Sequence, residues 1–448
     1  MRFKGTLILA VVCLALLAAA IFLEKPAPKG EEGEKYLFKM ESAKIHRITL
    51  TRGDTVIAAR RGEARWTIER PGPALANKDE WNGLAQTLST LDYDRVVDEK
   101  GADAGAFGLA QPDLAVVFEE EKGKTYKVEF GAENPTGSFY YARRGNDSKV
   151  YLVSRYTRDK FLPDPDRLRE NRAMIFDSLA LESFDLQRPS QNLKFSRKNY
   201  NWHLDAPVQA RANDTEVGDL LRKCAEQKVS DHLDGRSADE LKKSLGTVQY
   251  RLTLRLEKNL QEILEVGGPA SFDGLSGQSM AYNVTRDDYF TVPESFLALL
   301  QTGLDKLRNP DLAEFYPFEV KMCTIVSDGA KTVLYKGKED DWFWKTGQDP
   351  VKLARSKVEE YLGRIRDLKV QAFIDDPGDP ARFGLAGPAV KIILDIPDKS
   401  GLTLAFGREE GGLVYARNFE YPSVCRIEAA TCKAIRPDPA AWKEQKGK

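Results

Sequence analysis

The chain has 448 residues, of which 42% are hydrophobic and 30% are charged, a composition typical of a folded protein with more than one domain. Its 67 basic and 68 acidic residues nearly cancel, which leaves no overall attraction to nucleic acid, so no nucleic-acid partner is expected. The five cysteines include no CxxC pair and do not indicate a disulfide framework; Cys425 and Cys432 could bridge or stay free.

The first predicted element is an apolar helix over residues 6–23. This run of 18 residues carries no formal charge, and as a helix it would span roughly 27 Å, close to the ~30 Å hydrocarbon core of a bilayer. Arg2 and Lys4 precede it, so residues 1–5 are predicted to be a cytoplasmic tip. The sequence thus predicts a single-pass anchor in the inner (cytoplasmic) membrane, with the C-terminal body extracytoplasmic, or periplasmic. A cleaved signal peptide is the alternative, because the alanines at 18–20 are small enough for cleavage.

Residues 24–43 are rich in proline, glycine and charged residues, and they are predicted to form a spacer between the membrane and the body. The rest of the chain contains an internal repeat. Residues 107–112 (FGLAQP) recur 276 residues later as residues 383–388 (FGLAGP). Halfway between them, Leu245 and Gly246 precede a predicted strand at the matching place, without the Phe and Pro of the motif.

A tryptophan recurs with the same spacing. Trp66, Trp202 and Trp342 are separated by 136 and 140 residues, and these two offsets add up to the same 276. Helical and strand-like stretches follow each tryptophan in one order, which predicts three diverged copies of one unit. The predicted repeats are residues 44–173, 174–309 and 310–443.

Each repeat is predicted to combine a sheet with a helix. Apolar and polar residues alternate strictly from Tyr250 to Leu256, which indicates a half-buried strand. In the first repeat a helix begins near Asn77, where the apolar residues Trp81 and Leu84 have helical spacing. The predicted fold class is α+β: one N-terminal transmembrane helix, followed by three tandem, mainly antiparallel-sheet units, each with one packed helix.

The recurring residues have a structural interpretation. A tryptophan in a strand is more often a core anchor than a ligand contact. In the FGL-x-x-P motif, glycine permits a tight turn, proline stiffens the entry to the next strand, and Phe and Leu fill the core. The residues assigned to this structural motif are Trp66, Trp202, Trp342, Phe107, Gly108, Leu109, Pro112, Phe383, Gly384, Leu385 and Pro388.

Other aromatic residues are candidates for contact with a ligand or a partner. Phe343 and Trp344 follow Trp342, and the two indoles are expected on one strand face, as a stacking platform or as a core plug. Tyr140 and Tyr141 lie in a predicted strand of the first repeat.

No motif points to catalysis. The three histidines, His46, His203 and His232, lack the spacing of zinc ligands, and the sequence has neither a P-loop nor a G-x-S-x-G elbow. No catalytic, cofactor-binding or metal-binding residue is assigned, no cofactor is expected, and the chain is predicted not to be an enzyme.

The order of the motifs resembles a known family. The apolar N-terminal run, W-x-[IL]-x-x-P at residues 66–71, a helix, FGL-x-x-P and paired strands ending in glycine are similar to the bacterial domain-of-unknown-function family numbered 4340, over most of residues 45–441. The second repeat departs from this pattern around Leu245, and no proline follows Trp342 in the third. Genes of that family often accompany an ABC-2-type exporter with a gliding-motility-like auxiliary subunit, and the family supplies no catalytic residues.

Two functional hypotheses follow. The resemblance implies a non-catalytic envelope accessory or scaffold protein, anchored in the membrane as an auxiliary partner of an ABC-type exporter or another envelope protein. The alternative is an exported ligand-binding protein, or an enzyme acting on a cell-envelope glycan. A deep pocket with converging polar groups would favour the alternative, and exposed apolar patches would favour the accessory role.

Overall fold

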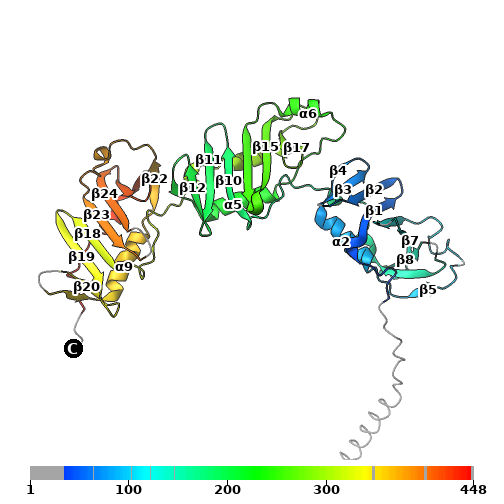
Figure 1. Cartoon of the computed structure of the whole chain (residues 1–448), viewed down its shortest axis with the longest axis horizontal. Coiled ribbons are helices and arrows are strands. Elements are labelled where there is room, and N and C mark those ends of the chain that lie inside the picture. Colours follow the sequence, from blue (N-terminus) through cyan, green and yellow to red (C-terminus); the bar gives the residue numbers. More distant parts are fainter. Residues whose placement is uncertain are drawn as a thin grey trace, which may run out of the picture. The chain divides into compact units, whose positions relative to one another are not determined.

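The computed structural model describes residues 35–444, except for residues 64, 102, 122, 146, 346–348 and 398–400. It contains three antiparallel sheets that follow one another along the chain (Figure 1). The chain divides into two compact units, Met1–Asn171 with the first sheet and Arg172–Lys448 with the second and third. The prediction of three tandem, mainly antiparallel units is confirmed, while their predicted boundaries stay a prediction.

The first sheet consists of two halves joined in its middle by the pairing of β1 with β6. The helix α2 (Lys78–Ser89) lies in the connection between the halves, and η1 (Ser42–Lys44), α3 (Arg155–Asp159) and α4 (Pro165–Leu168) are short. In sheet order the strands are β4 (Ala74–Leu75), β3 (Trp66–Arg70), β2 (Thr55–Arg61), β1 (Ile45–Arg52), β6 (Leu114–Glu120), β7 (Thr125–Glu133), β8 (Phe139–Arg144), β9 (Val150–Ser154) and β5 (Val96–Asp98).

The second sheet follows the same order with eight strands in place of nine. Its strands are β13 (Ala210–Arg211), β12 (Asn201–Ala206), β11 (Asn192–Lys198), β10 (Leu181–Gln187), β14 (Tyr250–Leu256), β15 (Leu260–Pro269), β16 (Gln278–Asn283) and β17 (Asp288–Pro293). Its helices are α5 (Asp214–Glu226), α6 (Ala238–Leu245), η2 (Glu257–Asn259), α7 (Glu294–Leu300) and α8 (Leu304–Leu307).

The third sheet repeats the order of the first. Its strands are β21 (Val351–Leu353), β20 (Trp342–Trp344), β19 (Ala330–Lys336), β18 (Met322–Ser327), β23 (Val390–Asp395), β24 (Leu402–Glu410), β25 (Leu413–Asn418), β26 (Val424–Glu428) and β22 (Val370–Ile374). Its helices are α9 (Arg355–Arg366), η3 (Pro380–Phe383) and α10 (Ala429–Lys433).

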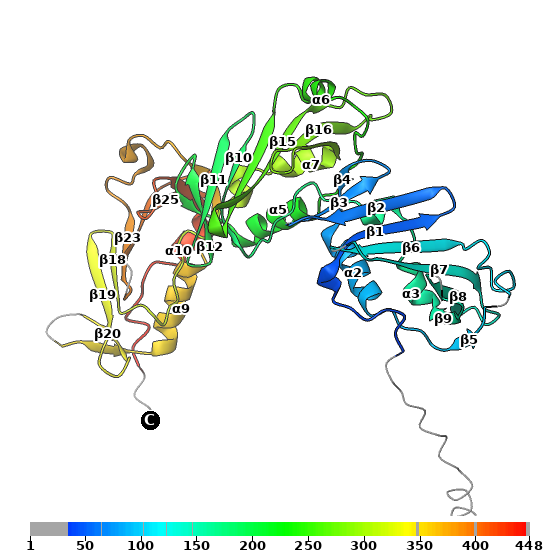
Figure 2. The ribbon, with the colours of Figure 1, turned by 45° about the vertical axis from the view of Figure 1, so that its right-hand side comes forward.

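Each sheet buries one face beneath its long helix, as Figure 2 shows for α2 and α9. In the first repeat the Asn77 side chain caps α2 by accepting hydrogen bonds from the backbone N–H groups of Asp79 and Glu80, at 3.1 and 3.4 Å. Trp81 of α2 is fully buried and stacks on Trp66 of β3, with ring centroids 5.8 Å apart. The helix therefore docks on the recurring tryptophan.

The three recurring tryptophans occupy equivalent places. Trp66 and Trp342 begin β3 and β20, and Trp202 is the second residue of β12. Each strand is the third along the chain within its own sheet. The three side chains are 1%, 5% and 0% exposed in chain order, so all three belong to the core beneath the long helix.

The Phe-Gly turns share a close backbone approach. Gly108, Gly246 and Gly384 all have positive φ, at 68°, 61° and 71°. The preceding residue, Phe107, Leu245 or Phe383, directs its carbonyl oxygen at a strand glycine. A Cβ built on Gly131, Gly267 or Gly407 would lie only 2.2, 2.0 or 2.0 Å from that oxygen. The motif of the middle repeat is therefore Leu245-Gly246, with leucine in the place of phenylalanine.

The predicted fold class is wrong in one element, the transmembrane helix. No helix among the described residues is both long and apolar enough to cross a membrane. The long helices that the structure does show have 12 or 13 residues, roughly 20 Å, and each has one buried face and one polar face. The predicted span at residues 6–23, the tip at 1–5 and most of the spacer at 24–43 lie outside the described residues.

The second and third repeats are joined by an ion pair whose arginine is buried. Arg308, whose side chain is 0% exposed, donates to both carboxylate oxygens of Asp375, at 2.8 and 2.7 Å. The Ser423 hydroxyl also donates to this carboxylate, at 2.9 Å. Burial by itself would raise the pKa of Asp375, but these hydrogen bonds and the charge of Arg308 lower it below its ordinary value. Backbone bridges link Ala212 with Arg308 and Asp311 with Lys369.

We expect Gly407→Ala to destabilise the third repeat by about 1–3 kcal/mol, because the Phe383 turn has to move away from the new methyl group. The matched control is Gly363→Ala in α9, where an added Cβ meets no atom within 4 Å. Alanine there should stabilise the helix by up to ~1 kcal/mol. Hydrogen exchange of β24 measures the local effect, and exchange as slow as in the wild type would contradict the close approach.

We expect Asp375→Asn to destabilise the second compact unit by about 1–3 kcal/mol at pH 7, since it removes the nearer counter-charge of the buried Arg308 and leaves Asp305 at 3.9 Å, while Asp375 itself is partly solvated. A carboxyl with a lowered pKa adds stability above its unfolded pKa and loses it as the pH falls through its folded pKa. The difference between the proteins should therefore shrink below about pH 4. Denaturant titrations at several pH values test this, with the exposed neighbour Asp376→Asn as control.

Candidate functional site

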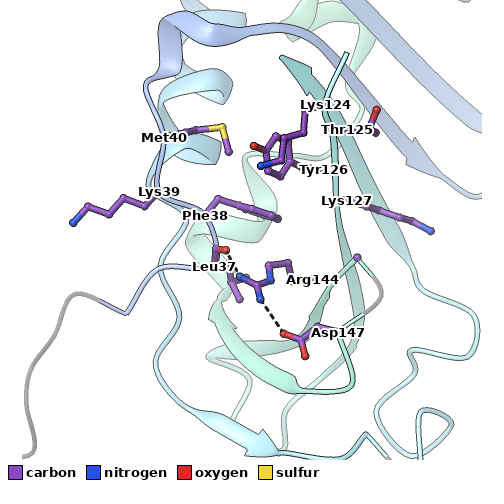
Figure 3. Close-up of a pocket in the computed structure, with 11 residues that line it drawn as sticks. Leu37, Phe38, Lys39, Met40, Lys124, Thr125, Tyr126, Lys127, Arg144 and Asp147 are labelled. Carbon is purple, nitrogen blue, oxygen red and sulfur yellow. Dashed lines mark hydrogen bonds and ion pairs between the residues drawn. The ribbon is translucent and has the colours of Figure 1, made fainter. Parts of the chain in front are cut away.

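An open groove with a volume of about 770 Å³ lies on the first repeat (Figure 3). Three segments form it: residues 37–40, which lead into β1, residues 124–127 at the start of β7, and the turn after β8 with Arg144, Gly145 and Asp147. The shape of the groove therefore depends on how β7 and β8 are placed beside residues 37–40, the segment of chain that enters the first repeat.

The base of the groove is aromatic. The buried ring of Phe38 packs edge-on against Phe118 at 5.0 Å, and Tyr126 stacks on Phe118 at 5.1 Å. The Tyr126 hydroxyl donates to Glu120 at 3.1 Å, which holds the ring in place. Figure 3 shows Phe38 and Tyr126 side by side in the middle of the groove.

Two cations border this aromatic base. The ammonium of Lys124 lies 4.9 Å from the centroid of the Tyr126 ring, a cation–π distance. Arg144 donates to the Leu37 carbonyl at 3.2 Å and to Asp147 at 3.3 Å. The other two lysines of the lining turn elsewhere: Lys127 pairs with Glu129 at 2.5 Å, and Lys39 points outward in Figure 3.

Asp147 is the acidic residue of the lining, and it is held ionised. Burial alone would raise its pKa. Hydrogen bonds from the Tyr151 hydroxyl, at 2.6 Å, and the Lys149 N–H, at 3.1 Å, together with the charge of Arg144, lower the pKa below its ordinary value. Arg144 is thus partly neutralised, and Lys124 adds a further positive charge. The groove suits an anionic group carried on an apolar or planar body.

The positions that correspond to Arg144 in the other two repeats have a structural role. Asn283 and Asn418 end β16 and β25 as Arg144 ends β8. Their side-chain amides donate to the carbonyls of Ala173 and Leu312, each at 3.0 Å, as Arg144 does to Leu37. The first repeat therefore keeps the hydrogen bond to the entering chain and adds a charge that the other two lack.

The structure places the predicted motif residues in two kinds of site. The tryptophans lie in the cores, whereas the Phe-Gly turns lie on the opposite face of each sheet. Phe107 packs against Tyr141 at 4.8 Å, and Phe383 against Tyr415 at 4.9 Å. Leu109 and Leu385 are buried, and Pro112 and Pro388 lie two residues before β6 and β23.

The candidate contact residues are not brought together. Tyr140 is half-buried beneath Arg158 at 4.4 Å, and Tyr141 supports Phe107. Trp344 packs against the same core as Trp342, so the two indoles are a core plug. Phe343 points to the opposite face, where its ring stacks on Tyr335 at 5.7 Å.

The two cysteines that could have formed a bridge are both present as thiols. Cys425 and Cys432 are free in the structure, and burial raises the pKa of each to about 12, so neither is a thiolate at neutral pH. In the part of the chain that is described, no group of three or more His, Cys, Asp or Glu residues could hold a metal ion.

The residues of the groove were not predicted from the sequence. Lys124 and Tyr126 belong to a strand pattern that repeats in all three copies, and the entering chain around Phe38 has no regular pattern. A signal does exist: aligning the repeats by their strands sets Arg144 against two asparagines, which marks a position where the first repeat departs from the others.

Comparison with known proteins supports the repeat. The model of a domain of unknown function, DUF4340, matches residues 66–245, 202–385 and 344–446. The matches begin at Trp66, Trp202 and Trp344, and the first two end at Leu245 and Leu385 in the turns described above. No curated protein matches the chain. Because the three matches together run from residue 66 to residue 446, the chain belongs to the DUF4340 family of domains of unknown function.

Proposed function

We propose that this chain is a non-catalytic envelope accessory protein, an auxiliary partner of an ABC-type membrane exporter that binds through the exposed surfaces of its repeats. One observation carries the proposal: the three repeats agree on their buried faces and differ on the half of the free face that the Phe-Gly turn leaves uncovered. The free face of a sheet is here the side opposite its long helix.

The buried faces are nearly interchangeable. Each contains a tryptophan at the same place, beneath a helix of 12 or 13 residues. These common features maintain the fold, and they leave the free face under little constraint from packing.

The free faces have different chemistry. On the first sheet Arg47 pairs with Glu69 at 3.0 Å and with Glu119 at 3.4 Å. On the second, Arg255 pairs with Asp185 at 2.8 Å, and Arg251 also pairs across strands. The same region of the third sheet is apolar. Repeats that keep one core and vary one surface offer several distinct contacts within one chain, which favours binding of a large partner.

The groove of the first repeat supplies a contact of another kind. Lys124 and Arg144 border an aromatic base and are opposed by Asp147 alone among the groove's lining residues. An acidic segment of a partner with an adjacent aromatic or aliphatic side chain complements this groove in charge and in shape.

The proposed location is the extracytoplasmic side of the inner membrane, where the outer loops of an exporter are within reach. The support for this comes from the sequence, where Arg2 and Lys4 precede the uncharged run at residues 6–23, a pattern typical of exported proteins. The family resemblance supports an exporter as the partner.

We expect Lys124→Glu to reduce several-fold the amount of exporter subunit that co-purifies with the full chain from native membranes, because it reverses the charge at the groove. The matched control is Lys78→Glu, the same change at the exposed first residue of α2, where a carboxylate is favourable for the helix. Quantitative mass spectrometry of the purified material measures the difference.

Thermal unfolding of both variants checks that the fold is unchanged. The accessory role would be wrong if exporter subunits failed to co-purify with the wild-type chain while the purified protein bound or cleaved a cell-envelope glycan.

A further inference from the structure

The free face of the third sheet has an apolar stripe. Met322 of β18 lies beside Tyr335 of β19, which lies beside Phe343 of β20. On the other side of β18, Thr324 lies beside Ile393 of β23. Met322 and Ile393 are 39% and 37% exposed, and the Tyr335 and Phe343 rings are half-buried. Four neighbouring strands thus present apolar side chains to solvent.

This stripe is specific to the third repeat. Strand register identifies the corresponding positions in the other two sheets. They are Arg47, Arg60, Thr67 and Val117 in the first sheet and Ser183, Ser196, His203 and Thr253 in the second. These strands have the same order in all three sheets, and among the eight corresponding residues only Val117 is apolar, so the fold does not require an apolar stripe at these places.

The other half of the same free face is already covered. Phe383 and Leu385 of the Phe-Gly turn pack there on Ala405, Tyr415 and Val424 of β24, β25 and β26. The turn does not extend over β18, β19 and β20, so the apolar stripe begins where this small cluster ends.

The charges around the stripe form a pattern along one strand. Lys391, Ile393 and Asp395 alternate with buried residues on β23 and therefore lie on the free face. Lys391 and Asp395 are four residues apart in a strand, roughly 13 Å, too far to pair with each other. Neither side chain forms an ion pair with any other described residue.

We propose that the uncovered half of the free face of the third sheet, which carries the apolar stripe, binds a second copy of this chain face to face, across a two-fold axis that passes over Ile393 at right angles to β23. Met322 then lies opposite Val326 of the second copy. This rotation reverses the strand direction of the second copy. Ile393 then meets Ile393 of the second copy, and Lys391 lies opposite Asp395 of the second copy at both ends of the contact. The pattern is self-complementary, which a contact between identical surfaces requires.

The same rotation suits the neighbouring strands. On β19, Lys331 and Tyr335 lie at opposite ends of the free face, with Val333 between them. Lys331 comes to lie opposite the Tyr335 ring of the second copy, where a cation is attracted by the ring face. An axis parallel to the strands would instead set Lys391 against Lys391, so the charges select one orientation.

We expect Ile393→Cys to give a cross-linked dimer of the full chain when membranes from expressing cells are treated with a short bifunctional thiol reagent. The two thiols would face each other at the axis, and sheets packed face to face lie ~10 Å apart, too far for a direct disulfide. The matched control is Thr253→Cys, the equivalent half-exposed position on the second sheet, which should give no dimer. The wild-type chain controls for the native cysteines.

Charge reversal tests the orientation. In the Ile393→Cys background, Lys391→Glu should lower the cross-linking yield roughly tenfold, because two carboxylates then face each other. Adding Asp395→Lys should restore the yield, and this rescue excludes a folding defect as the cause.

Equal cross-linking at positions 393 and 253, a cross-link formed only with a different protein, or a double reversal that fails to restore the yield would each overturn the proposal. Co-purification of an exporter does not depend on this contact, so the two proposals can fail separately.

Discussion

In every repeat, a carbonyl oxygen of the turn rests directly on a glycine of the sheet. The oxygens of Phe107, Leu245 and Phe383 lie where a side chain on Gly131, Gly267 or Gly407 would have to be. This approach places the turn over one half of the free face and leaves the other half open. The long helix and the tryptophan cover the opposite face, so the open half of the free face is the part of each sheet where residues can change without disturbing its packing.

The side chains in the open half of the free face differ between the three repeats. Ion pairs cover it in the first and second sheets, and an apolar stripe with charges at its ends covers it in the third. The groove also differs between the repeats. Arg144 donates a hydrogen bond to a backbone carbonyl, as Asn283 and Asn418 do at the equivalent positions, and it also carries a charge. The first repeat thus carries a surface charge at a position that has a structural role in all three repeats.

The repeats could be predicted from the sequence because the residues that recur in them are required by the packing of each repeat. Trp66 and its counterparts are spaced almost equally, and Gly246 keeps the turn even where the motif has lost its Phe and Pro. The turn was predicted to fill the core, but it forms a separate cluster on the other face, since Phe383 packs on Ala405 and Tyr415. A single strand does not reveal which of its faces a following turn will cover.

The groove and the stripe were not predicted, for different reasons. The groove combines residues 37–40 with side chains almost 90 and more than 100 positions away, and only strand register brings them together. Both faces of β18 and β23 carry apolar residues, so the alternation of residue types does not tell which face is exposed, and Met322 and Ile393 lie on the exposed side. Helix α6 was also missed, despite the Ser237 and Glu240 capping box that begins it.

The junction at Arg308 restricts the insertions and duplications that such a chain can accept. Residues 308–311 are bridged to Ala212 of one repeat and to Lys369 of the next, and the guanidinium is locked to Asp375. An insertion of one or two residues here would break a bridge or pull the buried charge away from its partner. Duplication of a whole repeat, together with its junction, preserves both. A family built on such joints should therefore lengthen in steps of one complete period, with variation in loop length confined to the turns between strands.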